Sequence, residues 1–284
     1  MSVAAQASES SFVPAADGLP LCVYETGNPA GRELLLIHGF SQSYAVFKRQ
    51  FEGSLARDFR IVAFDLRGHG CSGKSWQESA YSSSQSWADD VATVIRERKL
   101  KRPLLVGWSY GGYINVDYVR HHGTAGIAGL VMVGSNAGLI ALTPELRQQM
   151  AKTREVTRGM KPDVEAQVAA GKTFVSVMTA KPAPDDMRDI MFATNQMLPT
   201  YVRRLIASRS LENEDMPPKL TTPVLLLVGN KDGSQSVDAL RALATRLPQG
   251  QITVMDGAGH AAFIDDPAGF DAEIRRFVTA TALR

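Results

Sequence analysis

The chain contains 284 residues, of which 44% are hydrophobic and 21% are charged, a composition typical of soluble globular proteins. Its 31 Lys and Arg residues nearly balance its 29 Asp and Glu residues, so neither nucleic acid nor an anionic membrane is an expected partner. At about 150 residues per domain, this length predicts one or two domains.

The N-terminal segment carries no targeting pattern. It has no basic region followed by an apolar run, so we expect no signal peptide. The longest apolar runs, such as 224–228, have the length of a strand and are far shorter than a membrane-spanning helix. Cys22 and Cys71 are too few for a disulfide framework and lack metal-ligand spacing, which predicts two thiols in a reducing cytoplasm and no metal site.

Strands and helices are predicted to alternate along most of the chain. A hairpin is expected at 12–24, where Asp17 and Gly18 separate two short apolar stretches. Six further runs are almost continuously apolar, as in strands covered on both faces: 33–37, 60–64, 103–106, 129–133, 224–228 and 252–255. Amphipathic helical patterns lie between them: 44–57, 84–99, 110–121, 237–246 and 267–280. This alternation predicts a mostly parallel α/β sheet.

The alternation stops between residues 136 and 213. Only helical patterns occur there: 144–158, 163–179, 185–191 and 200–211. Six of the ten methionines fall in this stretch, and methionine suits a surface that accommodates varied apolar shapes, although core packing explains any one of them equally well. We therefore predict one sheet domain, formed by 1–135 and 214–284, with a helical insertion at 136–213.

A serine in the sequence GWSYG at 107–111 is the predicted nucleophile. The pentapeptide follows a predicted strand and opens a predicted helix, which is the context that makes G-x-S-x-G informative. A sharp strand-to-helix turn exposes the Ser109 hydroxyl at the carboxyl end of the sheet. The N-terminus of the helix that follows stabilises negative charge developing there.

A serine hydroxyl needs a base to accept its proton, and the base needs an acid to orient it. His260 is the predicted base because it lies in a loop of small residues directly after the strand 252–255. Asp232 is the predicted acid because it follows the strand 224–228. Asp256, Asp265 and Asp266 lie close to His260 in sequence and rank lower. The remaining histidines (His38, His69, His121 and His122) are better explained by loop support or helix capping.

Acyl transfer also requires donors aimed at the developing oxyanion. The backbone N–H of Tyr110, which follows the serine, is one predicted donor. The backbone N–H of Phe40 is the other, because Gly39 permits a close approach of that loop. Trp108 and Met191 are predicted to line an apolar pocket for the acyl group.

Together these segments resemble the α/β-hydrolase superfamily. The resemblance rests on motifs that stand in the family's order over nearly the whole chain: LLLIHGF at 34–40, FDLRGHGCS at 64–72, the serine turn, GNKD at 229–232 and GAGH at 257–260. The order Ser109, Asp232, His260 is also that of the family. The resemblance implies the α/β-hydrolase fold, a doubly wound, mostly parallel sheet of eight strands. It also implies that 136–213 is a lid over the acyl pocket, and no cofactor is expected.

Several branches of the superfamily are disfavoured by the sequence. Serine at position 109 speaks against the similar epoxide hydrolases and haloalkane dehalogenases, which use a carboxylate nucleophile. No HGGG motif is present, which disfavours the branch similar to hormone-sensitive lipase. The chain resembles small bacterial esterases, lactonases and cofactor-free perhydrolases, and also hydrolases that cleave carbon–carbon bonds.

The sequence therefore predicts a serine hydrolase that cleaves a carboxylic ester or lactone through an acyl-enzyme. Its expected partner is a small, mostly apolar ester-like molecule. Three alternatives stay open: a C–C hydrolase of β-diketone-like substrates, a perhydrolase that uses hydrogen peroxide as acceptor, and a ligand receptor that retains the triad. A homodimer is also left open.

Overall fold

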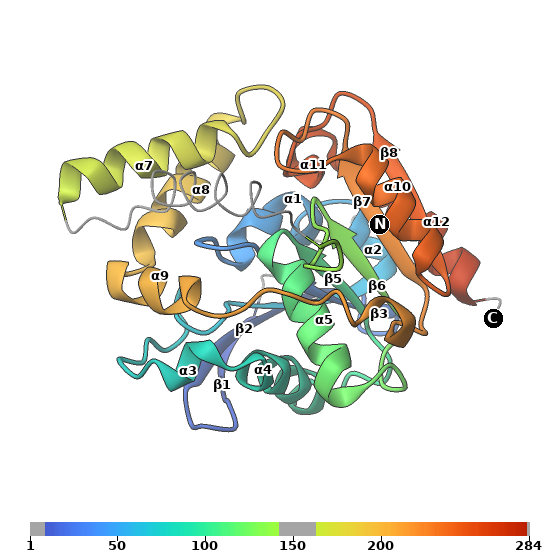
Figure 1. Cartoon of the computed structure of the whole chain (residues 1–284), viewed down its shortest axis with the longest axis horizontal. Coiled ribbons are helices and arrows are strands. Elements are labelled where there is room, and N and C mark those ends of the chain that lie inside the picture. The colour runs from blue at the N-terminus through green and yellow to red at the C-terminus, as the bar shows by residue number, and fades with distance from the viewer. Residues whose placement is uncertain (1–8, 142–162, 283–284) are drawn as a thin grey trace, which may run out of the picture.

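A single sheet of eight strands organises the molecule (Figure 1). The computed structural model describes residues 9–141 and 163–282. The strand order is β1-β2-β4-β3-β5-β6-β7-β8. The strands are β1 Glu9–Pro14, β2 Pro20–Gly27, β3 Arg32–Ile37, β4 Phe59–Phe64, β5 Leu104–Trp108, β6 Gly129–Val133, β7 Val224–Gly229 and β8 Gly250–Met255. The β1–β2 and β2–β4 pairs are antiparallel and the other five pairs are parallel, which confirms the predicted hairpin and mostly parallel sheet.

Both faces of the sheet are buried, which explains why its central strands are continuously apolar. In β7, Val224, Leu226 and Val228 belong to one core, whereas Leu225 and Leu227 belong to the other. The first core lies under α4 Ser84–Glu97, α5 Tyr110–His122 and α10 Val237–Arg246. The second lies under η1 Tyr44–Phe47, α1 Lys48–Phe51, α2 Leu55–Asp58, α11 Ala262–Asp265 and α12 Pro267–Ala282. The sheet is therefore doubly wound, the α/β-hydrolase fold expected from the sequence.

The helix predicted at 44–57 is wrong in one respect, because the structure divides it into η1, α1 and α2. The break between α1 and α2 falls at Gly53. A Cβ atom at Gly53 would collide with the carbonyl oxygen of Arg49, so the chain can turn there only because the residue is glycine. The short helices α3 Ser79–Ser82 and η2 Pro217–Lys219 were not expected.

Three described helices separate β6 from β7: α7 Val164–Ser176, α8 Asp185–Met197 and α9 Thr200–Ala207. The side chain of Asp163 caps α7 by accepting a hydrogen bond from Ala166 N at 2.7 Å. Helix α8 extends six residues beyond the predicted end at Met191, whereas the helix predicted at 144–158 lies outside the described residues. Figure 1 shows α7, α8 and α9 gathered at the opposite end of the molecule from α12. None of the helices in the described part of the chain combines the length and hydropathy needed to cross a bilayer.

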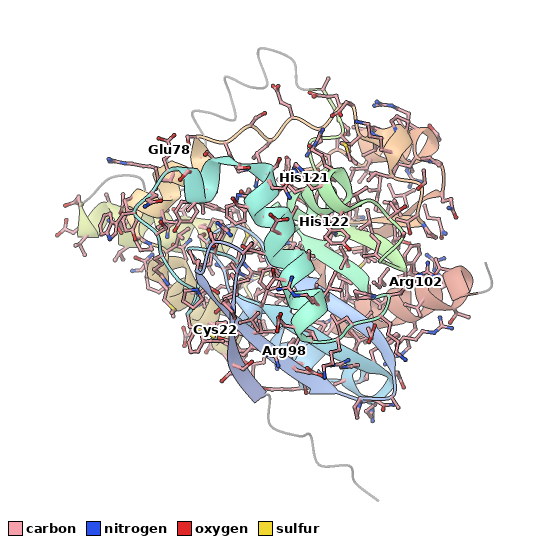
Figure 2. The ribbon with its side chains drawn as sticks, turned by 90° about the horizontal axis from the view of Figure 1, so that it is seen from below. Cys22, Glu78, Arg98, Arg102, His121 and His122 are labelled. Carbon is pink, nitrogen blue, oxygen red and sulfur yellow. A yellow bond between two sulfur atoms is a disulfide. The ribbon has the colours of Figure 1, made fainter. Side chains whose placement is uncertain are left out.

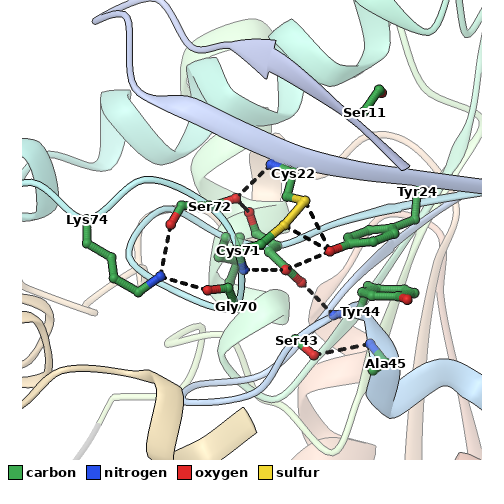
Figure 3. The surroundings of a disulfide bond; sticks show 12 residues. Ser11, Cys22, Tyr24, Ser43, Tyr44, Ala45, Gly70, Cys71, Ser72 and Lys74 are labelled. Carbon is green, nitrogen blue, oxygen red and sulfur yellow. Dashed lines mark hydrogen bonds between the residues drawn. A yellow bond between two sulfur atoms is a disulfide. The ribbon is translucent and has the colours of Figure 1, made fainter. Parts of the chain in front are cut away.

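The prediction of two free thiols is wrong, because Cys22 and Cys71 form a disulfide (Figure 3). The sheet register explains how residues 49 positions apart meet, since Val23 of β2 pairs with Phe64 at the end of β4. The turn that follows β4 therefore begins beside Cys22. Ser72 Oγ then accepts a hydrogen bond from Cys22 N at 2.9 Å, which holds this turn against β2.

A buried ion pair joins the segment that follows α9 to helix α5. Arg209 Nη2 lies 2.6 Å from Asp117 Oδ2, and the two side chains are 2% and 1% exposed. Arg209 Nη1 also donates to the hydroxyl of Tyr110 at 3.1 Å. One guanidinium therefore connects the chain after the inserted helices to the first residue of α5.

We expect the disulfide to stabilise the fold by about 2–4 kcal/mol, because it closes a long loop in the unfolded chain. Urea unfolding of the wild type with and without a thiol reductant measures this difference. The double variant Cys22→Ser/Cys71→Ser should match the reduced wild type and should not respond to reductant. A wild type whose stability is the same in both conditions would contradict the prediction.

Arg209→Ala is expected to destabilise the protein by about 3–5 kcal/mol, because it leaves the Asp117 carboxylate buried without its ion-pair partner. The apolar double variant Arg209→Met/Asp117→Leu should regain most of that loss in the same urea titration. Burial raises the pKa of Asp117 to about 6, above its unfolded value, so protonation favours the folded state. The deficit of Arg209→Ala should therefore be smaller at about pH 5 than at about pH 8. An equal deficit at both pH values would contradict this assignment.

Candidate active site

Ser109 occupies a strained turn between β5 and α5. Its φ of 53° and ψ of −111° lie outside the regions that residues with a side chain normally adopt. Such strain persists only where the surrounding structure imposes it, and it occurs preferentially at functional sites. The flanking residues Trp108 and Tyr110 are buried, whereas Ser109 is only half-buried. The turn therefore presents one hydroxyl at the end of an otherwise buried segment.

Close packing around the turn depends on glycine. A Cβ atom at Gly111 would collide with the carbonyl oxygen of Ile37, and one at Gly107 would collide with that of Gly111. Backbone hydrogen bonds complete the constraint, because Ser109 N donates to Val133 O at 2.9 Å. Strands β3, β5 and β6 together hold the serine turn in place.

Asp232 and His260 meet at the same edge of the sheet. Asp232 follows β7 and His260 follows β8, and His260 Nδ1 lies 3.0 Å from Asp232 Oδ2. An ionised carboxylate can only accept, so Nδ1 carries the proton of this hydrogen bond. Both residues are buried. Although burial raises the pKa of Asp232, the hydrogen bonds from His260 and Ser234 outweigh it and hold that pKa below its ordinary value.

The serine turn and the histidine loop are in direct contact. Trp108 Nε1 donates to the carbonyl oxygen of His260 at 3.0 Å. Between them lies Gly134 at the end of β6, where a Cβ atom would be 3.0 Å from His260 Nδ1 and 3.1 Å from Asp232 Oδ2. The ends of β5, β6, β7 and β8 thus converge on one place, as is general for ligand sites of parallel sheets.

Ser234 belongs to the same cluster and is not among the residues predicted from the sequence. Its backbone N and its Oγ both donate to Asp232 Oδ1, at 2.9 and 2.7 Å, and its Oγ lies 3.0 Å from His260 Nδ1. A serine two residues after an aspartate is a common turn pattern, in which the carboxylate accepts the later N–H. That pattern was visible in the sequence, but it does not show that the hydroxyl also reaches a histidine 26 residues away.

The three aspartates that rank below Asp232 have other partners. Asp256 accepts from Asn230 Nδ2 at 2.5 Å, and Asp266 accepts from the backbone N of Gly269 at 2.9 Å. Asp265 Oδ2 accepts from Gly259 N at 2.7 Å and from Ala180 N at 2.9 Å. Asp265 thus connects the histidine loop to the segment between α7 and α8.

The loop that carries Phe40 packs against the serine turn. A Cβ atom at Gly39 would lie 3.2 Å from the Cβ atom of Ser109, tighter than an ordinary contact, so the loop packs closely against the serine turn. His38 supports the loop, because its Nδ1 donates to Gly39 O at 2.7 Å and its Nε2 accepts from Leu66 N at 3.0 Å. Burial lowers the pKa of His38, as suits a neutral ring in this role.

The other histidines also have structural partners. His69 is buried, and its Nδ1 lies 3.0 Å from Arg67 O. Burial lowers the pKa of His69 well below its ordinary value. His121 and His122 lie at the end of α5 beside α4, where they contact Ser84 and Asp89 (Figure 2).

The predicted pocket residues lie in the core near the site. Trp108 and Met191 are almost fully buried in the same apolar cluster, and Met191 O accepts from Gln42 Nε2 at 3.0 Å. A cavity of about 410 Å³ is formed by α7, α8 and the segment between them, and neither Trp108 nor Met191 lines it. Thr179 and Ala180 of that cavity do pack against Gly259, next to His260. The role of Trp108 and Met191 stays a prediction.

Among the described residues, one group of side chains has metal-ligand spacing: Cys22, Asp65 and Cys71. The two sulfur atoms are joined in the disulfide and are not thiolates. The Asp65 carboxylate accepts from the backbone N atoms of Tyr44 and Cys71, at 2.8 and 2.9 Å. This group is therefore better described as a structural junction.

Comparison with known proteins places this geometry in a family. The family model described as "Alpha/beta hydrolase family" matches residues 34–273. The AB hydrolase superfamily protein YisY of Bacillus subtilis is 26% identical over 275 residues, covering 94% of this chain and 98% of that protein. A pimeloyl-[acyl-carrier protein] methyl ester esterase of Vibrio atlanticus is 26% identical over 262 residues, covering 87% and 94%.

Solved structures agree with this assignment. The crystal structure of the esterase RhEst1 from Rhodococcus sp. ECU1013 superposes with a TM-score of 0.83 at 30% identity, covering 96% of this chain and 99% of that one. The esterase EaEST from Exiguobacterium antarcticum has the same fold, with a TM-score of 0.82 at 22% identity, covering 95% and 100%. With the family model matched over most of its length, the chain belongs to the alpha/beta hydrolase family and is a hydrolase.

Proposed function

We propose that this hydrolase cleaves a carboxylic ester or lactone through an acyl-enzyme, with Ser109 as nucleophile, His260 as general base and Asp232 as the orienting acid. The observation that carries the proposal is the strained Ser109 turn at the sheet edge where Asp232 and His260 are hydrogen-bonded. The names of the relatives, several of which are esterases, support ester chemistry.

The hydrogen bond to Asp232 determines how His260 acts. Because Nδ1 donates its proton to the carboxylate, Nε2 retains a lone pair and can accept a proton. His260 Nε2 takes the proton of Ser109 Oγ as that oxygen attacks the carbonyl carbon. The Asp232 carboxylate stabilises the imidazolium that forms.

The tetrahedral intermediate then needs stabilisation of its oxyanion. The backbone N–H groups of Phe40 and Tyr110 are the proposed donors, which the close packing of Gly39 against Ser109 supports. Collapse of the intermediate releases the alcohol, which takes the proton from His260. His260 then removes a proton from water as the water attacks the acyl-enzyme, and Ser109 Oγ takes that proton from His260 as the acid product leaves.

We also propose that residues 136–213 form a lid on a core made of 1–135 and 214–284. Contacts between this insertion and the Phe40 loop support the proposal, because Gln42 Nε2 donates to Met191 O and Asn195 Nδ2 donates to Ser41 Oγ at 2.8 Å. Trp108 of the core and Met191 of the proposed lid belong to one apolar cluster, which suits a small, mostly apolar acyl group. The esterases among the relatives favour an ester over a β-diketone, a peracid or a retained receptor ligand.

The disulfide bears on where the protein is located. The cytoplasmic location predicted from the sequence stays a prediction, and the Cys22–Cys71 disulfide argues against a strongly reducing compartment. A homodimer likewise stays open, and the mass of the protein in solution decides it.

Ser109→Ala is expected to lower kcat for p-nitrophenyl butyrate by about 10³-fold or more, because it removes the nucleophile and leaves only binding and oxyanion stabilisation. It should also abolish covalent labelling by a fluorophosphonate probe. Ser82→Ala, an exposed serine at the end of α3, is the matched control and should retain both. Unchanged hydrolysis by folded Ser109→Ala would contradict the nucleophile assignment.

A substrate panel tests the bond that is cleaved. The panel contains esters, lactones, vinylogous β-diketones, and esters with hydrogen peroxide as the acceptor in place of water. We expect hydrolysis of esters and lactones with short apolar acyl groups to give the highest kcat/KM. A diketone turned over faster than every ester would replace ester cleavage by C–C cleavage. Binding of these molecules without turnover of any of them would favour a receptor.

A further inference from the structure

We propose that Ser234 is a positioning residue of the active site, which acts on His260 together with Asp232 and does not touch the substrate. The inference rests on the proposed function, since it assigns a role within the same triad. It comes from the hydrogen bonds of one hydroxyl, which lies within 3.0 Å of both the acid and the base.

The directions of these hydrogen bonds follow from the chemistry of the partners. The carboxylate can only accept, so the Ser234 hydroxyl donates its proton to Asp232 Oδ1 at 2.7 Å. The lone pairs of Ser234 Oγ are then left to face His260 Nδ1, 3.0 Å away. His260 Nδ1–H is therefore shared between two acceptors, Asp232 Oδ2 and Ser234 Oγ, each at 3.0 Å.

This arrangement fixes the Asp232 carboxylate as well as the imidazole. Oδ1 accepts from the N and Oγ of Ser234, and Oδ2 accepts from His260. The Asp232 side chain is fully buried, so water does not replace a lost donor without rearrangement. Without the Ser234 hydroxyl, the carboxylate keeps one N–H on Oδ1 and gains freedom to rotate away from the ring.

Packing does not fix this loop at every residue. A Cβ atom at Gly233, between the two residues, would have no heavy atom within 4 Å. Ser236, two residues further along, has a different task, because its Oγ caps α10 by accepting from Ala239 N at 3.2 Å. The side chain of Ser234 is thus a second link, beside Asp232, between this open loop and the base.

The test is the kinetics of Ser234→Ala, with Ser236→Ala as a control that removes a hydroxyl from the same loop. We expect Ser234→Ala to lower kcat for p-nitrophenyl butyrate by about 10- to 100-fold, the range for a lost hydrogen bond to a charged group, with KM nearly unchanged. Ser234→Thr, which keeps the hydroxyl, should recover most of that loss. Ser236→Ala should keep wild-type kcat.

A double-mutant cycle with Asp232→Ala separates this role from a general loss of stability. Because Ser234 acts through the acid–base pair, its removal should cost much less in the Asp232→Ala background than in the wild type. An equal loss in both backgrounds, or a kcat for Ser234→Ala within twofold of the wild type, would overturn the proposal. Failure of this proposal can be told apart from failure of the proposed function. An active Ser109→Ala variant would overturn both, whereas an inactive Ser109→Ala variant together with a fully active Ser234→Ala variant would overturn only the role of Ser234.

Discussion

The backbone conformation of Ser109 is the constraint on which the rest of the site depends. A residue with a side chain stays at a φ of 53° only where neighbouring segments leave it no relaxed alternative. Here the neighbours are the end of β3, which lies so close that Gly111 cannot carry a side chain, and the end of β6, where Val133 O accepts a hydrogen bond from Ser109 N. The hydrogen bonds and burial of the whole parallel sheet offset the free-energy cost of this strain. As a result, one hydroxyl is held at the carboxyl edge of the sheet.

The same edge explains how residues far apart in sequence come to lie at one place. Parallel strands β5, β7 and β8 all end there, so Ser109, Asp232 and His260 each follow a strand that ends at this edge. The sheet fixes the approximate place, and hydrogen bonds then fix the orientation. Asp232 is held by Ser234, and the His260 backbone is held by the indole of Trp108.

Much of this architecture could be predicted because burial on both faces leaves a local trace, a continuous apolar run, at each central strand. The serine turn was also predictable, because its glycines and the strand and helix that flank it are contiguous in sequence. The Cys22–Cys71 bond, the Arg209–Asp117 pair and the hydroxyl of Ser234 on His260 were not. Each depends on a contact between distant segments, and no local pattern encodes the register that brings such segments together.

The inserted helices and the segment between α7 and α8 are hydrogen-bonded to the loops that carry His260 and Phe40. Ala261 N donates to Met178 O, and Asp265 accepts from both Gly259 N and Ala180 N, so the loop of His260 is bonded to the chain between α7 and α8. On the other side, Asn195 of α8 donates to Ser41 beside Phe40. The helices that would select the acyl group are therefore bonded to the loops proposed to hold the base and the oxyanion. Because these hydrogen bonds join the two regions, we expect a change in the packing of α7 on α8 to alter the position of those loops, and so to affect the proposed substrate selection and catalysis together.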